Sequence, residues 1–337
     1  MKRLLVLLFV LLFSVNSFAK VRIFIIQSYS KNDLCGVPQL KGFLNEMRYY
    51  GYNDNNTLYK IVFLKTKTVN ITKKQQRAIA DKVYKEILNF KPNIVVLFDD
   101  PAFRLFARRL LGKPFYVVFS GINVLPSVYN KKLHFMKNRI PTANIVGVYE
   151  KLHIAESVEF MQKILGNGKI AVVSSKDLIG RIVKNQIIYE LKQAHLSNLF
   201  VFFDVDSVNE LKRALERINK DKSIVAYILN THSLSFNGKR IDIFHIIPIA
   251  IKIARKPDIA INTTFAKAGL FGGVAIDFKA MGRQAADMAV KLLNETDINK
   301  LKIENAQKAL LVINLKRAKQ LNIKLPISVL NALDEAY

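Results

Sequence analysis

The sequence predicts an α/β protein made of two doubly wound lobes, each with a parallel sheet covered by helices. Apolar runs of strand length alternate with amphipathic helical segments along nearly all of the 337 residues. Such runs, apolar on both faces, are typical of parallel sheets buried between helices. The alternation restarts near Asn144, which indicates a second lobe. Most strands end in a polar turn, and in such sheets ligands gather at the carboxyl ends of the strands.

The length and the hydrophobic content of 50% are enough for roughly two domains. Two basic residues, an apolar run and a small-residue pattern at 17–19 begin the chain. We therefore expect a secretory signal peptide over residues 1–19, cleaved after Ala19, and a soluble mature protein in the periplasm. The apolar run is shorter than the ~20 residues that a membrane span needs. The lone Cys35 has no partner for an internal disulfide, and it lies too far from the cleavage site to carry a lipid.

The chain is strongly basic, with a formal charge of +26 from 52 Lys and Arg against 26 Asp and Glu. Removing Lys2 and Arg3 with the signal peptide leaves +24 (26 − 2). Nucleic acid and anionic membrane are the usual partners of such a charge. Here the lysines are dispersed singly along helices without interleaved aromatic residues, which favours solvated helix faces. We expect no nucleic-acid partner, and an acidic ligand or partner stays open.

The elements of the first lobe follow from apolar runs, helical periodicity and turn residues. The expected strands are 20–27, 59–64, 94–98 and 115–119, and the expected helices are 37–50, 72–90 and the segment after Pro101, with a loop to about Pro141. In the second lobe the expected strands are 144–149, 169–174, 199–203, 224–229 and 258–262, and the helices are 154–165, 180–195 and 207–219. A glycine-led segment at 272–277 then leads into a helix over 281–293.

Polar residues that follow these strands are the candidate ligand contacts. They are Ser28, Tyr29, Asp99, Asp100, Ser120, Gly121, Asn123, Tyr149, Ser175, Asn230, Thr263 and Asp277. A carboxylate in a partly closed cleft stays ionised only beside a donor or a cation. The aspartates therefore favour a ligand with an amino group, such as an amino acid or an aromatic amine. Lys176 would turn this preference toward a zwitterion.

Two of these candidates have a plain structural alternative. Asp100 precedes Pro101, which suits the first turn of a helix, so Asp100 is either a helix N-cap alone or a cap that also meets the ligand. Tyr149 is either a ligand contact or a buried residue near the hinge. The sequence alone leaves both alternatives open.

The residue patterns that are typical of enzymes do not occur in this sequence. The five histidines and one cysteine show no metal-ligand spacing. A G-x-G at 166–168 precedes a strand and lacks a third glycine, and neither a P-loop nor a G-x-S-x-G motif occurs. Asp99 and Asp100 are adjacent at a strand end, where side chains diverge, so paired acid–base catalysis is disfavoured. We expect no metal, no cofactor and no catalytic residue.

Several short motifs, in order, resemble the periplasmic substrate-binding proteins of ABC transporters with the type I, two-lobe fold. They are Ser28-Tyr29, Gly42, Asp99-Asp100-x-Ala102-Phe103, VVFSGIN at 117–123, VGVYE at 146–150, GRQAADMAVKLL from Gly282 and INLKRAKQLNIKLP at 313–326. The resemblance covers nearly the whole mature chain. It implies that the chain crosses between lobes, with residues 20–142 and 272–305 in the first lobe and residues 143–271 and 306–337 in the second.

The resemblance implies a solute receptor whose lobes close on a small molecule, which a permease in the inner membrane then receives. We expect a monomer. The versions of the motifs at 99–103 and 120–123 also resemble members that serve as extracytoplasmic sensing modules. The second hypothesis is therefore a ligand-sensing subunit for a membrane histidine kinase or a diguanylate cyclase.

Overall fold

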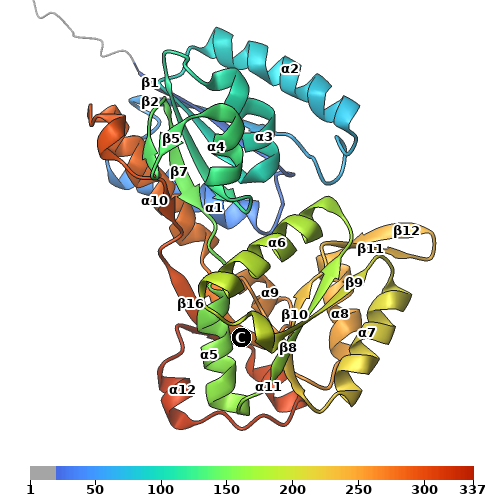
Figure 1. Ribbon diagram of the computed structural model, residues 1–337. Coiled ribbons are helices and arrows are strands. Elements are labelled where there is room, and N and C mark those ends of the chain that lie inside the picture. Colours follow the sequence, from blue (N-terminus) through green and yellow to red (C-terminus); the bar gives the residue numbers. More distant parts are fainter. Residues whose placement is uncertain (1–19) are drawn as a thin grey trace, which may run out of the picture.

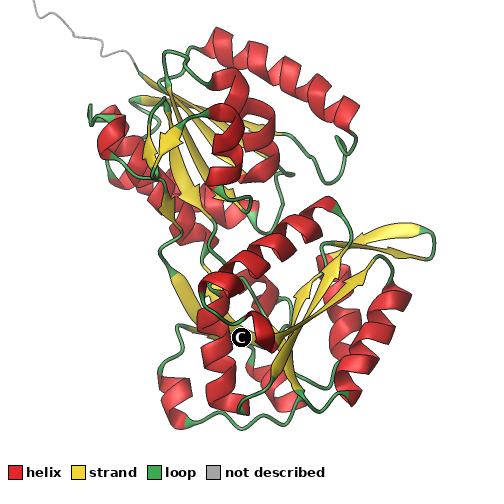
Figure 2. Cartoon of the chain, viewed as in Figure 1, coloured by secondary structure: helices red, strands yellow, loops and turns green. Residues whose placement is uncertain are grey.

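The computed structural model describes residues 20–337, so the expected signal peptide lies outside the described residues. The chain forms two lobes, each with a central sheet between layers of helices (Figure 1). The carboxyl ends of the main parallel strands of each sheet point toward the other lobe (Figure 2). Within residues 20–337, no helix combines the length and the apolar character needed to cross a membrane.

The first lobe contains a six-stranded parallel sheet. Its strands, in spatial order, are β15 (Glu304–Asn305), β7 (Ile145–Tyr149), β4 (Tyr116–Ile122), β3 (Ile94–Phe98), β1 (Val21–Gln27) and β2 (Thr57–Phe63). Its helices are α1 (Gly36–Tyr49), α2 (Lys73–Phe90), α3 (Asp99–Leu110), α4 (Pro126–Leu133) and α10 (Phe278–Leu293), joined by the small hairpin β5 (Met136–Lys137) and β6 (Ile140–Pro141) and the short turn η2 (Ile298–Lys300).

The second lobe contains a seven-stranded sheet in which β16 runs antiparallel to β14 and the other pairs are parallel. Its strands, in spatial order, are β17 (Glu335–Ala336), β16 (Ala309–Ile313), β14 (Gly272–Ile276), β13 (Asp258–Ile259), β10 (Ile224–Asn230), β8 (Lys169–Ser175) and β9 (Phe200–Val205). The remaining elements are α5 (Ile154–Leu165), α6 (Leu178–Gln193), η1 (Ser197–Leu199), α7 (Val208–Lys220), the hairpin β11 (Ser233–Phe236) and β12 (Lys239–Asp242), α8 (Ile243–Ile253), α9 (Thr263–Lys267), α11 (Leu315–Gln320) and α12 (Ile327–Asn331).

Most of these elements lie where the sequence predicts them, because local signals determine where they begin and end. In α2, the Thr72 side chain accepts a hydrogen bond from the Gln75 N–H while the Gln75 side chain accepts one from the Thr72 N–H. This reciprocal cap fixes the helix start. Val83 and Ile87, four residues apart, are buried on one face against the sheet. The prediction of a loop that runs to about Pro141 is wrong, because this segment contains α4 and the β5–β6 hairpin.

The predicted boundaries between the lobes are wrong at two strands. β7 was expected to open the second lobe, but it pairs with β4 in the first sheet, with Val146 beside Val118. β14 was expected in the first lobe, but it pairs with β13 and β16 in the second sheet. Apolar strands of equal length fit either sheet, so only the pairing partner decides. The chain thus crosses between the lobes after β7, after β14 and after β15.

Candidate ligand-binding site between the lobes

Asp99 is a buried carboxylate with an unsatisfied oxygen. It follows β3 with a left-handed backbone (φ 68°) and is 6% exposed, and its Oδ2 atom has no hydrogen-bond partner among the described residues. A Cβ atom on Gly121 would lie 2.8 Å from Asp99 Oδ1, so glycine leaves room for this carboxylate. Burial raises the pKa of Asp99 well above its usual range, and the Glu150 charge raises it further. A cationic donor at Asp99 Oδ2 would offset this cost.

Three further side chains of the first lobe surround Asp99. Lys67 Nζ lies 3.6 Å from the centroid of the Tyr29 ring and 2.8 Å from Asp33 Oδ2. Burial and then the Asp99 charge raise the pKa of Tyr29 well above its usual value. Glu150, in the first crossing between the lobes, is 8% exposed, and burial raises its pKa to about 8. The surroundings of Asp99 thus combine acidic side chains with one ammonium group, that of Lys67.

Asp100 has a different role from its neighbour. Its Oδ2 atom accepts the Asn123 N–H at 2.8 Å, and its Oδ1 atom accepts the Val124 N–H at 3.3 Å and the Tyr129 hydroxyl at 2.8 Å. Both oxygens therefore hold the β4–α4 loop. Both alternatives made Asp100 a helix N-cap, and that assignment is wrong, because α3 begins at Asp99 and Asp100 accepts no N–H of that helix.

Ser28 and Ser120 are buried and satisfied within the first lobe. Ser28 Oγ accepts the Ala102 N–H at 2.8 Å and donates to the Phe98 carbonyl at 2.6 Å, so it caps the start of α3 from the neighbouring strand. Ser120 Oγ accepts a bond from Gln39 Nε2 at 3.0 Å. Both residues are 0% exposed, so their hydroxyls support the site residues from inside the first lobe.

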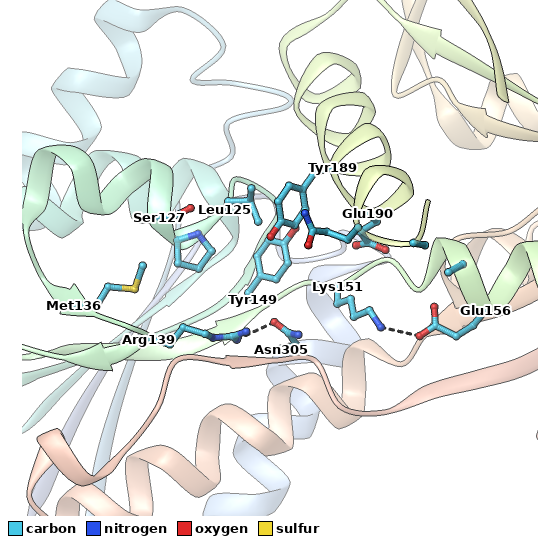
Figure 3. Close-up of a pocket in the computed structure, with 14 residues that line it drawn as sticks. Leu125, Ser127, Met136, Arg139, Tyr149, Lys151, Glu156, Tyr189, Glu190 and Asn305 are labelled. Atoms are coloured by element: carbon cyan, nitrogen blue, oxygen red, sulfur yellow. Dashed lines mark hydrogen bonds and ion pairs between the residues drawn. The ribbon is translucent and has the colours of Figure 1, made fainter. Parts of the chain in front are cut away.

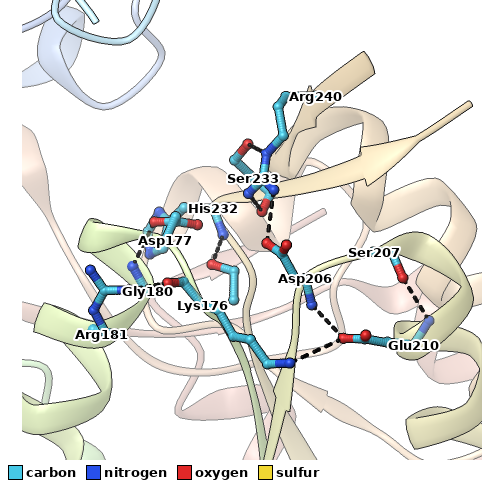
Figure 4. Close-up of polar contacts among 11 residues, drawn as sticks. Lys176, Asp177, Gly180, Arg181, Asp206, Ser207, Glu210, His232, Ser233 and Arg240 are labelled. Carbon is cyan, nitrogen blue, oxygen red and sulfur yellow. Dashed lines mark hydrogen bonds and ion pairs between the residues drawn. The ribbon is translucent and has the colours of Figure 1, made fainter. Parts of the chain in front are cut away.

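The second lobe contributes polar groups at the ends of β8 and β10 (Figure 4). Asp177 Oδ1 caps α6 by accepting the Gly180 N–H at 2.9 Å, while its Oδ2 atom has no partner among the described residues. The Thr231 hydroxyl is buried and also lacks a partner there. Burial lowers the pKa of His232 to about 4, and the Lys67 charge of the other lobe contributes. Together the two sides form what we term the interlobe cluster: Tyr29, Lys67, Asp99, Glu150, Asp177, Thr231 and His232.

Other predicted contacts of this lobe support the cluster or lie outside it. Ser175 Oγ accepts the His232 N–H at 3.0 Å, and Asn230 Oδ1 lies 3.1 Å from His232 Nε2. These two residues orient the histidine. Asp277 caps α10 by accepting the Ala280 N–H at 3.0 Å. Thr263 is the first residue of α9 and is half-buried.

One side chain joins the two lobes directly. Gln186 of α6 accepts a hydrogen bond at 3.1 Å from Asn123 Nδ2 of the first lobe, and it donates to the Glu150 carbonyl. Gln186 is 2% exposed. The predicted contact Asn123 is therefore an interlobe residue, held on one side by Asp100 and on the other by α6.

Tyr149 lies in a separate pocket of about 480 Å³ beside the crossings (Figure 3). The lining of this hinge-side pocket includes none of the other predicted contacts and no residue of the interlobe cluster. It comes from α4, the β5–β6 hairpin, α5, α6 and the two crossings at 149–151 and 305. Tyr149 is therefore a buried residue near the hinge that also faces a cavity.

Sequence reasoning missed Lys67, Glu150, Asp177, Thr231 and His232 as site residues. Four of them lie within two residues of a strand end, at 150, 177, 231 and 232, so the rule that selected Asn230 had the signal to select them too. Lys67 had no such signal, because it sits in an exposed β2–α2 loop and meets Tyr29 only through the fold. Within residues 20–337, no cluster of three potential metal ligands forms.

Two α/β lobes joined by three crossings, with polar strand ends facing each other, define a two-lobe ligand-binding protein of the type I periplasmic binding protein class. The chain belongs to the family of ABC transporter substrate binding proteins, whose sequence model matches residues 40–336. Members of this family bind small molecules, work with ABC transporters and are not enzymes. The family is generally extracytoplasmic.

Solved structures share the fold at low sequence identity. An ABC domain from Streptococcus pneumoniae in complex with L-Trp is 18% identical, with 95% of this chain and 100% of that chain covered and a TM-score of 0.69. The ligand-free, open substrate binding protein CD0873 from Clostridium difficile is 14% identical, covering 91% and 96%, with a TM-score of 0.69. A conserved domain protein from Vibrio cholerae is 18% identical, covering 94% and 100%, with a TM-score of 0.69. No curated protein sequence matches this chain.

Proposed function

We propose that the protein captures a small amine-bearing solute, such as an amino acid, at the interlobe cluster and delivers it to an ABC importer as a periplasmic monomer. The unpartnered, buried Asp99 carboxylate carries this proposal. An ammonium group there would make a charge-assisted hydrogen bond to an oxygen that lacks one. Lys67, which lies over the Tyr29 ring, offers a cation for a ligand carboxylate. The related protein with bound L-Trp supports the same ligand class.

Titration calorimetry of the mature protein with the standard amino acids and with matched amines tests this function. We expect at least one α-amino acid to bind, and its deaminated analogue to bind at least tenfold more weakly, because the analogue leaves Asp99 unpaired. Tighter binding of the deaminated acid, or no binding by any amine, would contradict the proposal.

Sensing is the second candidate, because the motifs at 99–103 and 120–123 also resemble sensing modules. Transport and sensing need the same ligand site, so binding data do not separate them. Reconstitution with candidate membrane partners does. An importer whose ATP hydrolysis rises with the loaded protein supports delivery, whereas activation of a histidine kinase or a cyclase supports sensing.

A further inference from the structure

The hinge-side pocket has the size of a ligand site. Its volume of about 480 Å³ lies within the range of roughly 300 to 1,000 Å³ that small-molecule sites occupy. Residues of both lobes line it: Leu125 and Pro126 come from the first lobe, and Tyr189 and Glu190 come from α6 of the second. Asp99, Lys67 and His232 are not among its lining residues, so it is distinct from the interlobe cluster.

The inner surface of this pocket is suited to an aromatic ring. Tyr149 and Tyr189 lie near each other there (Figure 3), and Leu125, Pro126 and Met136 add apolar surface. Aromatic rings gain stability when they stack or meet edge to face with other rings. The Tyr149 hydroxyl is buried close to the Gln186 side chain but forms no hydrogen bond of good geometry among the described residues, so a polar atom of a ligand would satisfy it.

Arg139 provides a positive charge that no carboxylate compensates. Its head group donates to the Ile303 carbonyl at 2.7 Å and to Asn305 Oδ1 at 2.8 Å, which are both neutral, and among the described residues it forms no ion pair. Arg139 also has a left-handed backbone (φ 68°) in the β5–β6 turn, where glycine is favoured.

The other charged groups of the pocket are largely paired within the protein. Lys151 Nζ lies 2.7 Å from Glu156 Oε1, and His153 Nδ1 lies 3.2 Å from the same oxygen. Glu190 accepts the Leu152 and Ile154 N–H groups. Glu156 Oε2 is buried without a partner, so it adds one free acceptor near Lys151. Of the two basic residues among the lining, Arg139 is thus the one without an ion pair, and it lies on the opposite side of Asn305 from Glu156 (Figure 3).

We propose that the hinge-side pocket is a second binding site, which takes a small aromatic carboxylate. The ring packs against Tyr149 and Tyr189, and the carboxylate binds Arg139 by charge-assisted hydrogen bonds. Because both lobes line the pocket, an occupant contacts the chain on both sides of the crossings.

Calorimetric titration with phenylacetate and with neutral phenylacetamide tests this site. Phenylacetate should bind saturably, and phenylacetamide at least tenfold more weakly. Arg139→Gly should weaken phenylacetate binding at least tenfold, and glycine suits the left-handed backbone there. Tyr189→Ala should also weaken it at least tenfold through loss of the ring. Asn138→Gly is the matched control, because Asn138 is the other left-handed residue of the same turn and does not line the pocket.

Any of three results from these titrations would overturn the second site. They are no saturable binding by roughly 10 mM, equal binding of the amide, or full retention of binding in both Arg139→Gly and Tyr189→Ala. Asp99→Asn separates this proposal from the proposed function, since it should leave phenylacetate binding unchanged while it weakens amino-acid binding. Loss of phenylacetate binding in Asp99→Asn would place the probe at the interlobe cluster and also overturn the second site.

Discussion

Asp99 and Asp100 are adjacent residues with opposite surroundings, and they give a matched pair of tests. Asp99→Asn removes a buried carboxyl group that has no partner at Oδ2, so the ligand-free melting temperature should stay the same or rise. An amine ligand should lose a charge-assisted hydrogen bond of roughly 1.5–3 kcal/mol, which weakens its binding about ten- to a hundredfold. Calorimetry and thermal unfolding measure the two effects. Unchanged affinity would refute the ligand role of Asp99.

Asp100→Asn should give the reverse result. An amide nitrogen cannot accept hydrogen bonds, so either the Asn123 N–H or the Val124 N–H and Tyr129 hydroxyl lose their acceptor. We expect a loss of about 1–3 kcal/mol in unfolding free energy, measured by chemical denaturation. The affinity should change much less than in Asp99→Asn. A larger loss of affinity than in Asp99→Asn would show that Asp100 meets the ligand after all.

Glu150 makes the stability of the ligand-free protein depend on pH. Burial raises its pKa from 4.5 to about 8, so between these values the folded state holds a proton that the unfolded state has lost. Stability should therefore fall as the pH rises through this window, by at most about 1.4 kcal/mol per pH unit from this group, and level off above it.

Glu150→Gln should reduce that slope and raise the melting temperature at pH 8. Glu159→Gln is the control, because Glu159 is 69% exposed and pairs only with Lys163 on the surface. Thermal unfolding of the three proteins between pH 5 and pH 9 checks both expectations. An identical pH slope in Glu150→Gln and in the unsubstituted protein would contradict the burial argument.

At the scale of elements, helices α1 and α10 pack closely, because a glycine of each helix lies against the backbone of the other. A Cβ atom on Gly42 would lie 2.0 Å from the Lys279 carbonyl oxygen, and one on Gly282 would lie 2.0 Å from the Gln39 carbonyl oxygen. The contact attaches α10, which follows the second crossing, to the first lobe. It also places Gln39 next to Ser120, behind Asp99 and Gly121.

Gly42→Ala should therefore push α1 and α10 apart and cost roughly 1–3 kcal/mol of unfolding free energy, as overpacked cores do. Lys41→Ala, at the exposed neighbouring position, should stay within about 0.5 kcal/mol of the unsubstituted protein. Denaturant titrations of the two variants measure the difference. Equal stability of both variants would mean that the helices separate at no cost.

At the scale of the whole molecule, Gln186 bridges the lobes through Asn123 and the Glu150 carbonyl. Gln186→Leu keeps the volume but leaves two polar groups unpaired when the lobes meet. We expect a larger radius of gyration in small-angle X-ray scattering and about tenfold weaker ligand binding, because the lobe arrangement that binds becomes less populated. Gln76→Leu, on the first lobe where Gln76 bonds only Arg104, should change neither quantity. An unchanged radius of gyration in Gln186→Leu would contradict the role of Gln186 as a bridge between the lobes.

The sequence by itself determined the two-lobe α/β class and most element positions, because apolar runs, helical spacing and caps such as Thr72 are local signals. It also placed Asp99 at a strand end, where ligands bind. Only the tertiary structure decided which sheet β7 and β14 join, since strands that are apolar on both faces fit either one. The tertiary structure alone also decided which of the two aspartates keeps an oxygen without a hydrogen-bond partner. Asp100 finds its partners 23 to 29 residues further along the chain, whereas Asp99 finds none at Oδ2, and such distant pairings have no local signature.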